Sequence, residues 1–213
     1  MNMRQLDVLV NDRLVGCLAE ADDLWTFEYD PAWRDTADAF DLSPALPRNG
    51  GLHRDGATSR PVQWYFDNLL PEEALRGVLA KEAALQAEDA FRLLAYYGAE
   101  SAGALVLQTP DKPTAADKGL RPLSHAELSA RIKNLPTVSL THDAPKHMSL
   151  AGAQHKLLVV QQDNELYEPL AGTPSTHILK PDHPDASYPA SAMNEYFTMR
   201  LAAAAGLSPP LVQ

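Results

Sequence analysis

The chain has 213 residues, 45% of them hydrophobic, which is typical of one large folded domain or two small ones and argues against disorder. Its 18 basic and 28 acidic residues give a net charge of −10, which disfavours a protein that coats nucleic acid. No run of about 18 apolar residues and no signal-peptide core occur, so we expect a cytoplasmic protein without a membrane span. The single cysteine, Cys17, excludes an internal disulfide.

The first half of the chain predicts a small unit of strands and helices. Alternating apolar residues predict a hairpin that turns at Asn11-Asp12, and helical spacing of apolar residues begins near Val62. Residues 41–63 are rich in proline and glycine and predict a loop. In chain order, the expected strands and helices cover 6–10, 14–18, 25–29, 62–85, 88–97 and 104–107. We expect Cys17 to be buried in a strand, and the aromatic residues Trp64, Tyr65 and Phe66 to lie in the core.

The second half begins with a proline-containing linker over 109–123. Ser124 and Glu127 form a capping-box pattern that predicts a short helix ending at Pro136. Strands over 157–160, 166–168 and 176–180 and a long helix over 191–205 follow. The elements predict an α+β fold with three regions: an N-terminal subdomain over 1–108, a linker with a short helix over 109–145, and a further lobe over 146–213.

A segment of small residues, 149–156, carries the clearest chemical signal. Small residues let the backbone approach a ligand closely, and their N–H groups can face phosphate oxygens. The segment opens into a strand, and Lys180 lies in a later strand, which is the layout of a kinase nucleotide lobe. Glu195, on the following helix, could hold Lys180 as an ion pair. Small-residue turns before strands are common, so a plain tight turn and a solvated lysine are the alternatives.

Other catalytic motifs are absent from the sequence. It contains no Walker P-loop, no GxGxxG, no HExxH and no GxSxG pattern. The histidines show no metal-ligand spacing, so we expect no metal site, and we expect His155 to be an exposed loop residue.

Several motifs in order resemble one family. They are Phe27–Trp33, Leu42–Pro47, Phe66–Glu72, Gly98–Leu105, Ser149–Lys156, Pro174–Lys180 and Asn194–Phe197. On these motifs, which run through nearly the whole sequence, the chain resembles the N-terminal half of the HipA family, the serine/threonine kinase toxins of bacterial toxin–antitoxin modules.

The resemblance implies a fold and an activity. The implied fold is a small β-hairpin and helix subdomain followed by an incomplete kinase-like N-lobe of antiparallel strands and one long helix. The implied activity is ATP- and Mg2+-dependent phosphorylation of a protein substrate, such as glutamyl-tRNA synthetase, which arrests translation and growth. The implied partner is a HipB-like helix-turn-helix antitoxin, through which contact with DNA would be indirect.

The resemblance also assigns roles to residues. It implies that the loop Ala151, Gly152, Ala153, Gln154, His155 and Lys156 contacts the ATP phosphates and that Lys180 is the ATP-binding strand lysine. Ser149 matches the serine that these kinases autophosphorylate, which would switch the enzyme off because a phosphate there repels ATP. The pairing of Glu195 with Lys180 is our own geometric expectation.

The sequence departs from the family in one large respect. The catalytic and magnesium-binding aspartates of the family lie in a helical C-terminal lobe, and no HRD-like or DFG-like segment occurs in these 213 residues. We therefore expect no catalytic residue and no magnesium ligand here, and no phosphate transfer by this chain alone. The chain could be a truncated protein, the product of a frameshifted gene, or half of a split protein.

Two alternatives remain open at the level of sequence. The chain could be a non-catalytic binding module that pairs with a separate kinase or antitoxin chain. It could also be a degenerate remnant that folds poorly, because its nucleotide lobe would expose the face that a second lobe normally covers.

Overall fold

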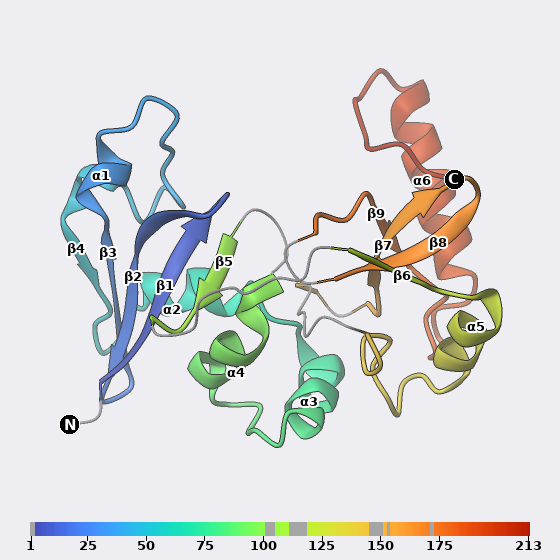
Figure 1. Cartoon of the computed structure of the whole chain (residues 1–213), viewed down its shortest axis with the longest axis horizontal. Helices are drawn as coiled ribbons and strands as arrows, with labels where there is room; N and C mark the ends of the chain where they lie inside the picture. The colour runs from blue at the N-terminus through green and yellow to red at the C-terminus, as the bar shows by residue number, and fades with distance from the viewer. Residues whose placement is uncertain (1–2, 101–104, 111–118, 145–150, 153, 171–172) are drawn as a thin grey trace.

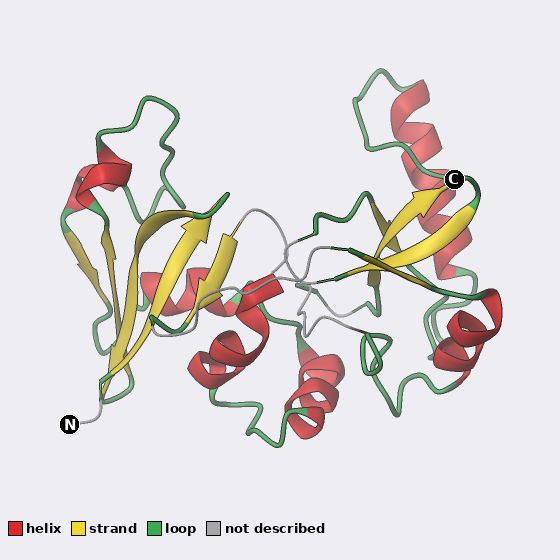
Figure 2. Cartoon of the chain, viewed as in Figure 1, coloured by secondary structure: helices red, strands yellow, loops and turns green. Residues whose placement is uncertain are grey.

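Two antiparallel sheets organise the molecule, which we describe from a computed structural model (Figure 1). The structure describes residues 3–100, 105–110, 119–144, 151–152, 154–170 and 173–213. Figure 2 shows the strands gathered in two groups, with helices α3 and α4 between them. The predicted α+β class is confirmed.

The first sheet has five strands in the order β4-β3-β2-β1-β5. Their bounds are β1 Arg4–Val10, β2 Arg13–Ala21, β3 Leu24–Tyr29, β4 Leu52–Arg54 and β5 Leu105–Gln108. The β1–β2 hairpin forms as predicted, because Leu6, Val8 and Val10 alternate toward the core. Asn11 and Asp12 turn the chain with φ of 49° and 62°, the left-handed conformation that a tight hairpin turn needs.

Helices cover the inner face of this sheet and build the first core. They are α1 Pro31–Arg34, α2 Pro61–Asp67, α3 Glu73–Glu82 and α4 Ala90–Tyr97, with short 3-10 turns at Arg48–Gly50 and Gly98–Glu100. Phe27 lies at the centre, with its ring centroid 4.8 Å from that of Tyr29 and 5.4 Å from that of Phe66. These edge-to-face and tilted contacts stabilise the core beyond the burial of the rings.

Several expectations for this part need correction. The loop expected over 41–63 contains β4, which pairs with β3, and the single helix expected over 62–85 is two helices separated around Pro71. Trp64 is 57% exposed, because α2 turns only Val62 and Phe66 fully inward. Cys17 is half-buried, on the outer face of the sheet.

Gly16 makes a close strand contact that a larger residue would break. A Cβ at Gly16 would lie 2.3 Å from the carbonyl oxygen of Glu28 and 2.8 Å from the ring of Phe27. We expect Gly16→Ala to lower the free energy of unfolding by about 1–3 kcal/mol, because backbone and a core ring must both move. Urea unfolding followed by tryptophan fluorescence measures this loss.

Gly77 is the matched control for this substitution. It lies exposed in α3, where an added Cβ meets nothing within 4 Å. Gly77→Ala should leave the protein equally stable or up to about 1 kcal/mol more stable, because alanine is the better helix former. Equal stability of Gly16→Ala and the parent protein would contradict the packing described for β2 and β3.

The second sheet has four strands in the order β6-β8-β7-β9. Their bounds are β6 Leu120–Pro122, β7 Leu157–Gln162, β8 Glu165–Pro169 and β9 His177–Leu179, and the helices are α5 His125–Lys133 and α6 Ser191–Ala204. The predicted N-cap is confirmed, since Ser124 Oγ accepts from the Glu127 backbone N–H at 3.2 Å, whereas the Glu127 carboxylate pairs with Arg131 instead of closing the capping box. Strand β6 corrects the linker expected over 109–123, because its residues pair with β8.

The long helix α6 lies beside the second sheet, and none of its side chains is fully buried. Met193, Phe197 and Leu201 are more than half exposed on it. Within the described ranges, no helix is both long and apolar enough to span a membrane.

Candidate functional site

The loop of small residues closes on itself at Gly152. Gly152 has a φ of +95°, a conformation that favours glycine, and a Cβ there would lie 3.2 Å from Lys156 Nζ. Lys156 Nζ donates to the carbonyl oxygen of Ala151. The lysine at the end of the loop therefore folds back over its beginning, and Ala151, Gly152, Gln154 and Lys156 are all half-buried.

Lys180 follows β9 directly and forms an ion pair with Glu195 of α6. Strand β9 pairs with β7, with Leu179 opposite Leu157. Because Leu157 is the residue after Lys156, this register places the two lysines at the same end of neighbouring strands. The role of Lys180 toward a nucleotide stays a prediction.

The two lysines concentrate positive charge beside the loop. The pKa of Lys156 lies below the usual lysine value, first because the side chain is buried and second because the ammonium group of Lys180 repels its charge. The carboxylates of Glu195 and Glu72 act in the opposite direction. An anion bound between the two ammonium groups would relieve their repulsion.

His155 is buried, with 6% of its surface exposed, which corrects the expectation of an exposed loop residue. Its Nδ1 has no hydrogen-bond partner among the described residues. Its pKa lies below the usual histidine value, first because of burial and second because of His183, while Glu82 raises it. His155 therefore lies neutral in the wall of the site rather than extending into solvent.

This environment predicts how His155 titrates. The neutral ring is favoured in the folded state, so the ring should titrate below the ordinary value of about 6.5 in the folded protein. As the pH falls, the ring therefore binds a proton in the unfolded chain before it does so in the folded protein. His155 then lowers the free energy of unfolding increasingly below a pH of about 6.5. Two-dimensional NMR of the histidine ring signals, with His155→Gln for assignment, measures the titration. A midpoint at or above 6.5 would contradict the burial described here.

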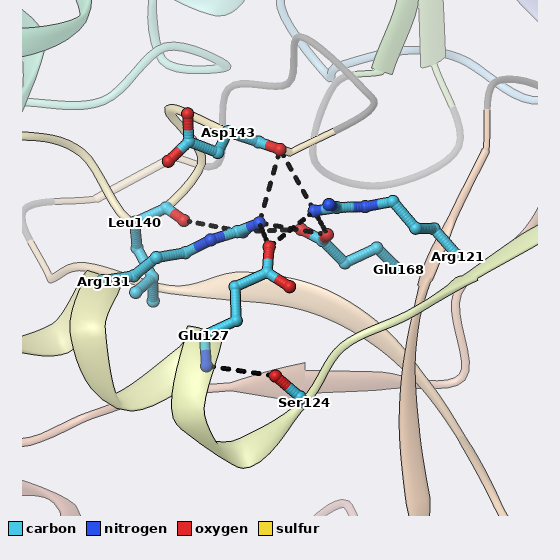
Figure 3. Close-up of polar contacts among 7 residues, drawn as sticks. All are labelled: Arg121, Ser124, Glu127, Arg131, Leu140, Asp143 and Glu168. Atoms are coloured by element: carbon cyan, nitrogen blue, oxygen red, sulfur yellow. Dashed lines mark hydrogen bonds and ion pairs between the residues drawn. The ribbon is translucent and has the colours of Figure 1, made fainter.

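Four charged side chains form an ion-pair network beside the chain segment that follows α5 (Figure 3). Glu168 of β8 is 1% exposed and accepts from Arg131 at 2.7 Å, and Arg121 contacts it as well. Arg131 also pairs with Glu127, one turn earlier on α5, at 2.6 Å. With two arginines and two glutamates, the network is neutral, so the buried guanidinium of Arg131 and the buried carboxylate of Glu168 each face an opposite charge.

The same arginines hold the chain after α5. Arg131 donates to the carbonyl oxygen of Leu140 at 3.4 Å and to that of Asp143 at 3.3 Å, and Arg121 donates to Asp143 at 3.1 Å (Figure 3). Nothing in the sequence pattern indicated this network, because its members come from β6, α5, β8 and a loop.

Two predicted site residues, Ser149 and Ala153, lie outside the described residues. Of the others, the structure brings Ala151, Gly152 and Lys156 together and joins Lys180 to Glu195. In the part of the chain that the structure describes, no group of three or more histidine, cysteine, aspartate or glutamate side chains is arranged to hold a metal ion.

Comparison with known proteins identifies the class of protein that has this fold and loop. The model of the HipA N-terminal domain matches residues 6–108, and that of the HipA-like C-terminal domain matches residues 148–213. The fold and these matches place the chain in a family of toxin–antitoxin kinases. The chain belongs to the HipA family.

Three relatives illustrate the similarity. The chain is 37% identical to "Putative kinase Y4mE" of Sinorhizobium fredii over 97% of its own length and 50% of that protein. It is 28% identical to the serine/threonine-protein kinase toxin HipA of Shewanella oneidensis, over 95% of its own length and 45% of that protein. A chain in the solved structure of the Shewanella oneidensis MR-1 HipA, HipB and operator DNA complex superposes with a TM-score of 0.67 at 27% identity, covering 94% of this chain and 45% of that one. The chain thus spans about half the length of the curated relatives it matches.

Proposed function

We propose that the chain is the N-terminal part of a HipA-like serine/threonine protein kinase toxin and that it binds the phosphates of ATP. The observation that carries this proposal is the register of β7 and β9, which sets Lys156 and Lys180 side by side at the end of the two strands, where Lys156 contacts the glycine-containing loop. In this proposal, residues 1–108 form the N-terminal subdomain and residues 146–213 part of the nucleotide-binding lobe. The connecting residues 109–145, expected as a linker with a short helix, contribute β6 and α5 to the second sheet and its core.

The residues present fit a polyphosphate. Backbone N–H groups of the loop from Ala151 to Lys156 would approach the phosphate oxygens, which the absence of a side chain at Gly152 permits. The ammonium group of Lys180, held by Glu195, would meet the phosphates from the neighbouring strand. Mg2+ would neutralise further phosphate charge, and we assign it no ligand among these residues.

Membership of the family supports a proposal about the wider activity. The enzyme would transfer the γ-phosphate of ATP to a protein substrate such as glutamyl-tRNA synthetase and so arrest translation and growth. A HipB-like helix-turn-helix antitoxin would hold it and link it to operator DNA, as the composition of the similar Shewanella complex supports. Autophosphorylation at Ser149 would place a dianion beside the phosphate site and switch nucleotide binding off.

Isothermal titration calorimetry tests the proposal directly. The 213-residue chain is titrated with a nonhydrolysable ATP analogue in the presence of Mg2+ and, separately, with adenosine. We expect the analogue to bind and adenosine to bind at least about tenfold more weakly, because the phosphates meet both ammonium groups. Equal affinities for the two ligands would contradict phosphate recognition, and so would no binding of the analogue.

A second candidate function is a non-catalytic module that pairs with a separate kinase or antitoxin chain. The exposed apolar face of α6 favours it, because Met193, Phe197 and Leu201 form the kind of surface that another polypeptide covers. Stable co-purification with a separately encoded kinase or antitoxin chain, together with failure to bind the ATP analogue, would favour this candidate over the first.

A further inference from the structure

The N-terminal domain touches the phosphate loop directly. Pro71, between α2 and α3, forms a parallel β-bridge with Gly152. Behind this bridge lies a cavity of about 20 Å³, lined by Pro71, Leu75 and Leu79 on one side and by Ser139, His155 and Lys156 on the other. A space of this size holds about one water molecule.

Glu82, the last residue of α3, forms the polar part of this contact. Its carboxylate accepts from the backbone N–H of Ser139 at 2.8 Å and from Ser139 Oγ at 2.7 Å. His142 Nδ1 lies 3.4 Å from the same carboxylate, which is only 16% exposed. A negative charge at the C-terminus of a helix is unfavourable for the helix itself. The position of Glu82 is therefore explained by the contact with Ser139 and not by the stability of α3.

Ser139 is linked to the loop through the second core. Its neighbour Leu140 is buried in the cluster that also contains Leu157, the residue directly after Lys156. Arg131 fixes the carbonyl oxygen of Leu140 from the ion network, as Figure 3 shows. The contact between Glu82 and Ser139 thus adjoins the core cluster that also contains the residue after Lys156.

We propose that the segment 71–82 of the N-terminal domain holds the phosphate loop in its binding conformation, with Glu82 as the positioning residue. This inference rests on the proposed nucleotide site. Pro71 sets the position of Gly152 through the backbone, and Glu82 sets the position of Leu157 through Ser139 and Leu140. The N-terminal domain is then part of the nucleotide site, and a partner that displaces α3 would change nucleotide affinity.

Hydrogen exchange on the nucleotide-free chain tests the holding contact. In Glu82→Ala, we expect the backbone amides of residues 154–158 to exchange about 10- to 100-fold faster, because charge-assisted hydrogen bonds are lost. Glu82→Gln keeps an acceptor for the Ser139 N–H and should give a smaller increase. Glu88→Ala, an exposed glutamate before α4, is the matched control and should leave these amides unchanged.

The outcomes separate this inference from the nucleotide site itself. Unchanged exchange in both Glu82 variants would overturn the inference whatever the chain binds. Faster exchange with unaltered affinity for the ATP analogue would also overturn it, because the loop would not need to be held. If the parent chain binds no analogue, the proposed function fails, and the exchange rates alone decide whether Glu82 holds the loop. Should Glu82→Ala not fold, Glu82→Gln and Ser139→Ala give the same comparison.

Discussion

Replacing Glu168 by alanine is expected to lower the free energy of unfolding of the second sheet by about 3–5 kcal/mol. Glu168 is 1% exposed, and its two oxygens face Arg131 and Arg121. Removing the carboxylate leaves Arg131, whose side chain is 5% exposed, with only Glu127 as an anionic partner. The penalty is large because it includes the cost of a buried cation that has lost its main counter-charge.

The positions of the tryptophans allow unfolding of the second sheet to be distinguished from unfolding of the N-terminal domain. All three, Trp25, Trp33 and Trp64, lie in the N-terminal domain, so their fluorescence follows that domain, whereas far-ultraviolet circular dichroism follows both. In urea, Glu168→Ala should shift the dichroism transition to lower concentration more than the fluorescence transition. Glu165→Ala, an exposed glutamate on the same strand, is the control and should shift neither. A loss below about 1 kcal/mol would mean that the network behaves like a surface salt bridge.

Replacing Lys180 by alanine should weaken binding of the ATP analogue by about 10- to 100-fold. The substitution removes a charged donor and also leaves the carboxylate of Glu195 near the phosphates without its cation. Lys180→Arg keeps the charge and should retain part of the affinity, although its planar group fits the position differently.

Calorimetry with matched variants measures this effect. Lys133→Ala removes an exposed lysine at the end of α5 and should bind as the parent chain does, which controls for net charge. If Lys180→Ala binds the ATP analogue as tightly as the parent chain does, Lys180 does not contact the phosphates, and the proposed site lacks its second cation.

Local patterns explain which elements could be predicted from the sequence. The β1–β2 hairpin follows from alternation and α5 from its Ser124 cap, each within a few residues. Helix α6 follows from a run of residues that ends at Gly206, whose φ is +85°. Strands β4 and β6 were missed because each has three residues and exists only through pairing with a distant strand. The proline- and glycine-rich sequence around each of them is typical of loops.

Some residues of the candidate site could likewise be predicted from local sequence and others could not. The candidate phosphate loop and Lys180 could be named because small residues before a strand and a lysine in a later strand are visible in sequence and match motifs of the HipA family, and their roles toward phosphate stay predictions. The burial of His155 and the contact of Glu82 with Ser139 could not, since they depend on how two distant parts of the chain pack. Trp64 was placed in the core because aromatic residues usually bury, whereas the direction of α2 leaves it exposed.

The most direct test of this account is a crystal structure of the chain with a nonhydrolysable ATP analogue and Mg2+. The account predicts that the triphosphate lies against the backbone amides between Gly152 and Lys156, with Lys180 Nζ within hydrogen-bond distance of a phosphate oxygen. A triphosphate bound away from this loop, with Lys180 still paired only to Glu195, would contradict it.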